Sequence, residues 1–367
     1  MTPVEFRRRL HRSPELSFRE ERTARFIAGQ LDRAGIAHRP IAGTGILARI
    51  EGKGDRTQAV VLRADIDALP IEERAAVAWR SEHPGAMHAC GHDLHAAVLY
   101  GVLLRLAARP DFEGTLFGLF QPGEEQNPGG ASRVLAEDPF AGYRVRAVIG
   151  EHVEPELPTG TLGFRPGKYM ASNDEIRLRL EGPGGHAAKR DEHADTVSAA
   201  ARLILDLTAL NTPERIVSIG RVEAPGATNV IPARIAMEGT MRTFDQTERA
   251  SLKQTVEALA RRNDADYGVR TCVEFTPGYP CVVNDPALTR RAVALAEQEG
   301  IPCRMLPLRT TSEDFGFYAE RYPSLFYRLG VGPDSGRLHT AMFNPDEAAI
   351  PAGIRFMERL ARKCFET

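Results

Sequence analysis

An eight-residue stretch at positions 88–95, His-Ala-Cys-Gly-His-Asp-Leu-His, places unusual demands on any fold that contains it. Such a density of imidazole, thiol and carboxylate groups is typical of a metal site. Cys90 and His92 flank a single glycine, which lets the backbone turn tightly enough for both side chains to face one point. The apolar run 96–106 that follows predicts a helix with Asp93 as its N-cap. We therefore expect a metal site at the start of a helix.

Composition excludes several classes of partner. A net charge of -2 over 367 residues gives no electrostatic basis for binding nucleic acid or an anionic membrane. No apolar run approaches the roughly 20 residues that span a bilayer, and residues 1–11 lack a signal-peptide core. The five cysteines are odd in number and widely spread, which fits reduced thiols better than disulfides. We expect a cytoplasmic protein with no nucleic-acid or membrane partner.

Charged side chains follow the ends of successive predicted strands. The strands, each with the polar residues that follow it, are 59–63 with Asp65 and Asp67, 115–121 with Glu124 and Glu125, and 146–150 with Glu151 and His152. Strands that alternate with helices predict an α/β domain with a mixed, largely parallel sheet and helices on both faces. Because ligands bind at the carboxyl ends of such strands, we expect these side chains to share one site.

The pattern changes near residue 172. Half-exposed, alternating strands and amphipathic helices predict an inserted α+β domain of the ferredoxin-like type. The expected strands are 175–180, 216–222, 235–242 and 269–275, and the expected helices are 194–209 and 247–261. From about residue 281 the α/β pattern resumes. The sequence therefore predicts a catalytic domain at 1–171 and 280–367, interrupted at 172–279 by a lid or dimerisation domain.

Nine ordered blocks of the chain resemble one family. They are LHRSPELSFRE (10–20), LRADIDALPIEE (62–73), MHACGHDLHAA (87–97), QPGEEQNPGGA (121–131), GEHVEPELPTGTLG (150–163), GGHAA (184–188), TNVIPARIAMEGTMRTF (228–244), SEDFGFY (312–318) and LHTAMFNPDEAAI (338–350). The chain resembles the metal-dependent amidohydrolases that include hippurate hydrolase, indole-acetyl-amino-acid hydrolases and N-acetyldiaminopimelate deacetylase, which are relatives of aminoacylase and glutamate carboxypeptidase.

Both this resemblance and the donor types point to one binuclear metal site. Cys90, His92, Glu125, His152 and His339 offer soft and borderline ligands for two divalent ions that share the thiolate. Thiolate and imidazole suit zinc, whereas relatives are often activated by manganese, cobalt or nickel. An ion pair of this kind can acidify water and polarise an amide carbonyl. We expect His95, which shares a helix face with His92, to be hydrogen-bonded structure and not a ligand.

The remaining site residues have expected roles of their own. Glu124, beside a metal ligand, is the expected general base, and Asp65 is expected to orient a ligand imidazole. The resemblance implies that His186 stabilises the carbonyl oxyanion, often in the neighbouring subunit of a homodimer. It also implies that Asn229 and Arg242 hold the free carboxylate of the substrate. In one departure from the family, Gly123 precedes Glu124 where alanine is commoner.

The sequence thus predicts a hydrolase that cleaves the amide of N-acyl amino acids, with N-acetyldiaminopimelate deacetylase as the nearest activity. The same binuclear site could instead serve a dipeptidase or carboxypeptidase. A third hypothesis, a non-catalytic protein that binds amino acids or peptides, is disfavoured because binding alone needs no base beside a metal ligand.

Overall fold

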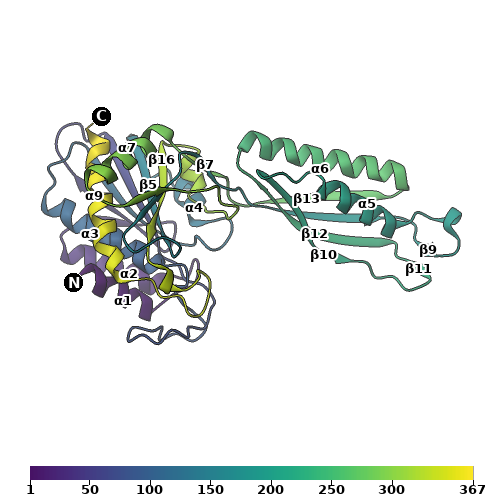
Figure 1. Ribbon diagram of the computed structural model, residues 1–367, viewed down its shortest axis with the longest axis horizontal. Helices are drawn as coiled ribbons and strands as arrows, with labels where there is room; N and C mark the ends of the chain where they lie inside the picture. The colour runs from purple at the N-terminus through teal and green to yellow at the C-terminus, as the bar shows by residue number, and fades with distance from the viewer. Residues whose placement is uncertain (367) are drawn as a thin grey trace. The chain divides into compact units, whose positions relative to one another are not determined.

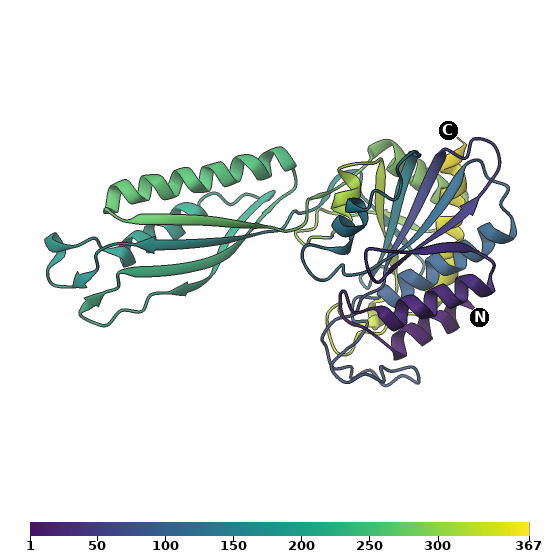
Figure 2. The same ribbon diagram turned by 180° about the vertical axis from the view of Figure 1, so that it is seen from behind.

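The computed structural model describes residues 1–366, apart from the side chain of Arg190, and contains two compact units. The first unit contains residues 1–169, 283–308 and the chain from residue 314 onward (Figures 1 and 2). The second unit contains residues 170–282 and 309–313. The sequence placed 309–313 in the catalytic domain. This segment joins the second unit because Met170 and Ala171 pair with it, with the amide of Ala171 donating to the carbonyl of Arg309 at 3.0 Å.

The first unit is built on an eight-stranded mixed sheet. In spatial order the strands are β1 (Ala37–Ile41), β2 (Gly45–Glu51), β4 (Thr115–Gln121), β3 (Gln58–Asp65), β5 (Arg144–Glu154), β16 (Ser324–Gly330), β6 (Leu162–Phe164) and β15 (Cys303–Met305). The four central strands β4, β3, β5 and β16 pair in parallel. Strand β3 is buried along almost its whole length, as expected for a parallel strand covered on both faces. The predicted α/β architecture is confirmed.

Helices cover both faces of this sheet. Five helices contribute to one hydrophobic cluster on one face, and they are α1 (Pro3–Arg12), α2 (Glu21–Arg33), α3 (His92–Ala108), α7 (Pro286–Gln298) and α9 (Ile350–Phe365) (Figure 2). Two short helices, α4 (Gly130–Ala136) and α8 (Gly316–Ala319), pack together on the other face. The 3₁₀ turns Pro333–Ser335 and Glu347–Ala349 precede α9. In residues 1–366, no helix is long and apolar enough to cross a bilayer.

The start of α3 differs from the predicted cap. Gly91 is the N-cap, with φ 82°, and a Cβ there would lie 2.6 Å from a methyl group of Val153, so a side-chain cap has no room. Asp93 lies inside the first turn and is fully buried against the guanidinium of Arg7, at 2.6 Å, and the ring of His11, at 2.9 Å. The expected capping role of Asp93 was wrong. Its carboxylate instead ties helix α1 to the ligand-rich stretch.

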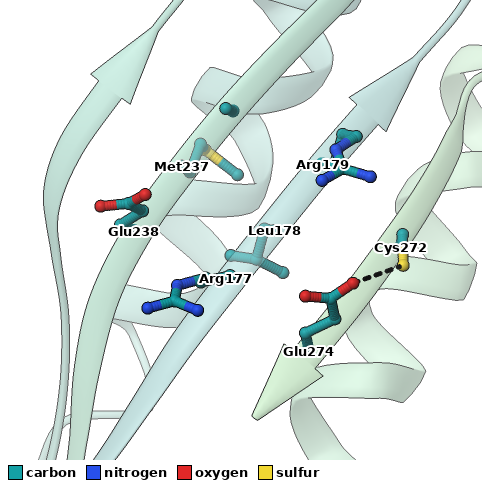
Figure 3. A pocket seen from close by; sticks show the side chains of 8 residues that line it. Arg177, Leu178, Arg179, Met237, Glu238, Cys272 and Glu274 are labelled. Atoms are coloured by element: carbon teal, nitrogen blue, oxygen red, sulfur yellow. Dashed lines mark hydrogen bonds between the residues drawn. The ribbon is translucent and has the colours of Figure 1, made fainter. Parts of the chain in front are cut away.

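The second unit has the predicted ferredoxin-like topology. Its elements run β8 (Asp174–Glu181), α5 (Thr196–Thr208), β10 (Arg215–Glu223), β12 (Arg234–Thr243), α6 (Gln246–Tyr267) and β13 (Arg270–Pro277). The antiparallel sheet has the order β10-β12-β8-β13, and both helices lie on one face (Figure 1). Residues of β8 alternate, with Ile176 and Leu178 in the core and Arg177 and Arg179 exposed on the open face (Figure 3).

Two small pairs of strands complete the structure. Strands β9 (Gly185–His186) and β11 (Val230–Ile231) pair antiparallel as a two-stranded ribbon in the second unit. The 3₁₀ turn Arg190–Glu192 follows β9. Strands β7 (Gly167–Met170) and β14 (Val282–Asn284) pair where the chain passes between the two units.

Candidate metal centre

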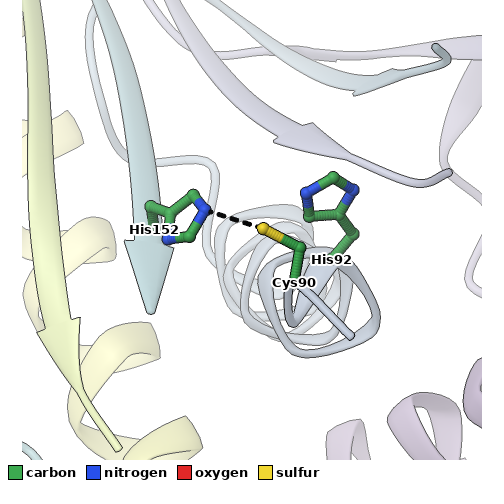
Figure 4. A group of neighbouring side chains, drawn as sticks. All are labelled: Cys90, His92 and His152. Carbon is green, nitrogen blue, oxygen red and sulfur yellow. Dashed lines mark hydrogen bonds between the residues drawn. The ribbon is translucent and has the colours of Figure 1, made fainter. Parts of the chain in front are cut away.

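Candidate metal ligands from distant parts of the chain meet at the sulfur of Cys90. Nε2 of His152, near the carboxyl end of β5, lies 3.3 Å from this sulfur (Figure 4). Nε2 of His339 lies 3.2 Å from the same sulfur. A carboxylate oxygen of Glu125 lies 3.3 Å from the same nitrogen of His339 and 3.9 Å from Nε2 of His92. The structure therefore brings all five predicted ligands together in the first unit.

Hydrogen bonds at the far ring nitrogens orient two of these histidines. Nδ1 of His92 contacts the carbonyl of Asp67 at 2.9 Å, and Nδ1 of His152 contacts the carbonyl of Val153 at 2.7 Å. Because a carbonyl only accepts, both Nδ1 atoms carry the proton and both Nε2 atoms can present a lone pair. Nε2 of His92 is buried and has no hydrogen-bond partner among the described residues. That orphaned nitrogen is accounted for by a metal ligand role.

The spacing of the donors suits two ions. One donor group is Cys90, His92 and His152, another is Cys90, Glu125 and His339, and within each group the donor atoms lie within 4.8 Å of one another. Donors on a tetrahedral zinc ion, with bonds of about 2.1 Å to nitrogen and 2.3 Å to sulfur, are about 3.6 Å apart. The two groups share only the sulfur. The residues present therefore fit a pair of divalent ions, which these five side chains would hold, with Cys90 contributing to both groups.

Protonation in the cluster reflects this crowding. Burial raises the pKa of the Cys90 thiol, and hydrogen bonds to Cys90 and Glu125 raise the pKa of His339 to about 10. In the metal-free cluster, protons thus sit on donor atoms that face one another. Metal ions that bind here must displace those protons, so ion binding is expected to release them.

Glu124 lies on the turn that follows β4 and is only 7% exposed. An oxygen of its carboxylate lies within 4.8 Å of donor atoms of His92 and Glu125. The turn allows both adjacent glutamates to reach the cluster because Gly123 adopts φ 62°, in the left-handed region that side chains avoid. This position is appropriate for a base that acts on a molecule bound beside the ligands.

Asp65 does not hold the ligand histidine that the sequence suggested. Its carboxylate contacts Nδ1 of His95 at 2.6 Å and the guanidinium of Arg63 at 2.7 Å, and lies 3.7 Å from Nε2 of His92. The group at Nδ1 of His92 is Asp67, through its carbonyl and a carboxylate oxygen at 3.2 Å. Sequence reasoning placed Asp67 at the site but gave it no role, because β3 ends at Asp65 and the path of the chain beyond a strand end is not readable from the strand pattern.

His95 is fully engaged in hydrogen bonds. Its Nδ1 faces Asp65, and its Nε2 accepts from the amide of Val153 at 2.9 Å. Burial lowers the pKa of His95, in keeping with a neutral ring that accepts at Nε2. Neither nitrogen is left to bind a metal ion. His88, also buried, has its pKa lowered to about 4 by burial, so it is neutral.

The other three predicted site residues belong to the second unit and are not all neighbours. His186 on β9 pairs with Val230, and the carbonyl of Asn229 accepts from the amide of Ala187, so His186 and Asn229 share one ribbon. Arg242 is near the other end of β12, where it donates to the hydroxyl of Ser312 at 3.3 Å. This ribbon leaves the sheet at the Arg234 end of β12, eight residues from Arg242, or about 26 Å along the strand. Within one copy, therefore, Asn229 and Arg242 do not bind the same small carboxylate.

Comparison with known proteins now identifies the family. A family model described as peptidase family M20/M25/M40 matches residues 61–363. The chain belongs to this family. The resemblance noted in the sequence is thereby confirmed, and so is the fold, an α/β unit interrupted by an inserted domain.

Relatives within the family cover nearly the whole chain. An N-acetyldiaminopimelate deacetylase of Exiguobacterium sibiricum is 37% identical over 98% of this chain and 98% of its own length. An N-acetyl-L-cysteine deacetylase of Bacillus subtilis is 36% identical over 99% of this chain and 88% of its own length. The solved structure of the Bacillus subtilis YxeP protein, described as a dinuclear metal-binding peptidase of the M20 family, has a TM-score of 0.90 at 33% identity and covers 100% of this chain and 98% of that one. A dinuclear neighbour agrees with the two donor groups around Cys90.

Proposed function

We propose that this chain removes the acyl group, foremost an acetyl group, from the amine of an N-acyl amino acid. As a member of the M20/M25/M40 family whose relatives include deacetylases, it is a hydrolase of amide bonds. The observation that carries the proposal is a buried glutamate, Glu124, whose carboxylate lies within 4.8 Å of donor atoms of His92 and Glu125, two of the five candidate ligands. The names of the relatives suggest that the acyl group is acetyl and that the product is a free amino acid.

Each residue of the site has a task in this reaction. Two divalent ions, for which we propose zinc, manganese, cobalt or nickel, would be held by Cys90 and its neighbours and would acidify water and polarise the amide carbonyl. Glu124 accepts a proton from the attacking water and returns it to the nitrogen of the leaving amine. His186 donates a hydrogen bond to the carbonyl oxygen as charge develops there, and Arg242 binds the substrate carboxylate.

We propose N-acetyldiaminopimelate as the first substrate to test and N-acetylcysteine as the second. The two relatives quoted above carry these activities in their names and are almost equally similar to this chain, at 37% and 36% identity. Both substrates present an acetyl amide next to a free carboxylate, as the roles of Glu124 and Arg242 require.

We also propose that the chain forms a homodimer through its second unit. Strand β10 is at the edge of the sheet, and the exposed apolar side chains Leu205 on α5 (66% exposed) and Val222 on β10 (49% exposed) lie in this unit. A partner copy would also explain the separation of Asn229 from Arg242, because the ribbon of one subunit can serve the site of the other.

The replacement Glu124→Gln tests the assignment of the base. We expect turnover of the acetylated substrate to fall by about 10³-fold or more, while the number of metal ions bound per chain stays that of the parent. Turnover within a few-fold of the parent would exclude Glu124 as the base. Dipeptides with a free N-terminus separate the alternatives, since a deacylase leaves them intact and a dipeptidase cleaves them.

Subunit complementation tests the dimer. Heterodimers of a Glu124→Gln chain and a His186→Ala chain contain one intact site only if His186 acts across the interface. Equimolar mixing makes about half of the dimers heterodimers, each with one intact site of two, so recovery of about a quarter of the parent activity supports the proposal. Leu205→Glu, on the exposed face of α5, should shift the sedimentation of the parent from dimer to monomer. A parent protein that is active and sediments only as a monomer would exclude the proposed homodimer.

A further inference from the structure

The N-terminal segment 15–17 runs beside the turn that follows β3. Leu16 pairs with Ala68 in parallel, and the amide of Ala68 donates to the carbonyl of Glu15 at 2.8 Å. In the same segment, the hydroxyl of Ser17 donates to a carboxylate oxygen of Asp67 at 2.7 Å. A side chain far from the cluster in sequence thus contacts the residue that orients His92.

Asp67 joins two of the proposed ligands. One carboxylate oxygen lies 3.2 Å from Nδ1 of His92, and the other accepts from the backbone amide of Glu125 at 3.0 Å. The oxygen bonded to the Glu125 amide is the one that receives the hydroxyl of Ser17. The plane of this carboxylate therefore depends on Ser17 as well as on the two ligands.

The residues that follow this segment contact the turn that carries Glu124. A carboxylate oxygen of Glu20 accepts from the amide of Gly123 at 2.8 Å. The ring of Phe18 packs so closely on Gly123 that a Cβ there would lie 2.3 Å from it. Residues 17–20 therefore hold the turn 122–125 from outside, through Asp67 at one end and Gly123 at the other.

We propose that Ser17 is a positioning residue of the metal centre, which acts through Asp67 to fix the ring of His92 and the backbone of Glu125. Ser17 touches neither proposed ligand. Without its hydroxyl, the Asp67 carboxylate loses one of the donors that set its orientation and can turn away from Nδ1 of His92. Outer partners of metal ligands tune affinity in this way. The inference rests on the proposed roles of His92 and Glu125 as ligands.

Cobalt binding by the full-length protein tests this role, with thiolate-to-cobalt absorption as a readout independent of activity. We expect Ser17→Ala to raise the dissociation constant for Co²⁺ about tenfold, at the low end of the range for outer partners of ligands. Ser17→Thr keeps the hydroxyl and should restore affinity to within about twofold. Ser198→Ala is the matched control, since it removes another serine–carboxylate bond of 2.7 Å, to Asp195 in the second unit. An unchanged Co²⁺ affinity in Ser17→Ala would overturn the proposal.

A double variant shows whether Ser17 acts through Asp67. Asp67→Asn should weaken Co²⁺ binding, and adding Ser17→Ala to it should change the affinity no further. Full additivity of the two effects would refute the proposed route. Loss of affinity in Ser17→Ala together with an equal loss in Ser17→Thr would assign the serine to packing alone. If Cys90→Ala leaves Co²⁺ binding unchanged, the ligand assignment itself is wrong, and that outcome is distinct from a failure of Ser17.

Discussion

Nε2 of His152 lies 3.3 Å from the sulfur of Cys90, although 62 positions separate the two residues in the chain. Cys90 precedes helix α3, and His152 lies near the carboxyl end of β5. The parallel pairing of β5 with β3 and β16 sets this meeting point, because it brings strand ends to one edge of the sheet. Because Cys90 belongs to both donor groups, its replacement tests the whole predicted ligand set.

Removal of this sulfur should abolish the paired-ion site. Since Cys90 is in both donor groups, we expect Cys90→Ala to bind fewer than one tightly held ion per chain, against two for the parent, as measured by elemental analysis after gel filtration. Cys272→Ala serves as the control, because that thiol is exposed on the sheet of the second unit. Retention of two ions by Cys90→Ala would contradict the bridging role.

The two aspartates after β3 should respond differently to loss of charge. Asp67→Asn is expected to weaken metal binding about 10- to 100-fold with little change in thermal stability, because it orients His92. Asp65→Asn removes a partner from the buried guanidinium of Arg63 and from His95, so its main effect should be a lower unfolding temperature of the metal-free protein. Metal affinity by titration and the unfolding temperature are measured for both variants. Equal changes in affinity and in unfolding temperature for the two variants would contradict these separate roles.

The fold could be predicted from the sequence because each helix and strand is marked by a local pattern of apolar residues. Each of these patterns lies within one element. They are the apolar run in β3, the apolar–polar alternation in β8 and the helical spacing of apolar residues within α5 and within α6. The five candidate ligands were predicted from the dense stretch 88–95, from the polar residues at strand ends and from the resemblance to a family. The α/β pattern predicted that polar residues at strand ends share one site, and Glu125 and His152 do lie together near Cys90.

The errors concern side chains whose partners are distant in sequence. His11 is completely buried between Asp93 and Glu73, and these contacts depend on how α1 packs on α3. Asp93 was predicted to be an N-cap because it shortly precedes the apolar run 96–106, whereas its actual partners, Arg7 and His11, are far away in the sequence. The role of Asp67 depends on the path of the chain after β3, and the hydrophobic periodicity of the sequence does not predict that path. Long-range ion pairs of this kind leave no pattern in one sequence.

Gly123 should tolerate no side chain while Phe18 is present. In Gly123→Ala, the added Cβ would meet the Phe18 ring at 2.3 Å, so the turn with Glu124 must move, and we expect kcat to fall at least tenfold. Adding Phe18→Ala should recover much of this loss. Gly35→Ala, at a similar φ of 67° but with no atom within 4 Å of the new Cβ, controls for backbone strain. Steady-state kinetics on the acetylated substrate measures all three, and failure of Phe18→Ala to restore kcat would contradict the steric explanation.

A buried carboxylate should make the stability of the second unit depend on pH. Asp174 is 1% exposed and contacts Arg249 at 2.6 Å and Lys253 at 2.8 Å. Burial alone would raise the pKa of Asp174, but hydrogen bonds from these two cations outweigh it and lower the pKa below its ordinary value of 3.8. The folded state thus favours the charged form, and its stabilisation is complete above the ordinary pKa and is lost as the pH falls through the lower folded value.

We therefore expect Asp174→Asn to lower the free energy of unfolding at neutral pH by about 2 kcal/mol, as measured by urea denaturation. The difference from the parent should shrink as the pH is lowered below 3.8, where the carboxylate of the unfolded parent becomes protonated. Glu181→Gln removes an exposed pair with Arg234 in the same sheet and should change stability by less than about 0.5 kcal/mol at either pH. A difference between parent and Asp174→Asn that stays constant from neutral to acidic pH would show that the ion pairs with Arg249 and Lys253 do not supply this stability.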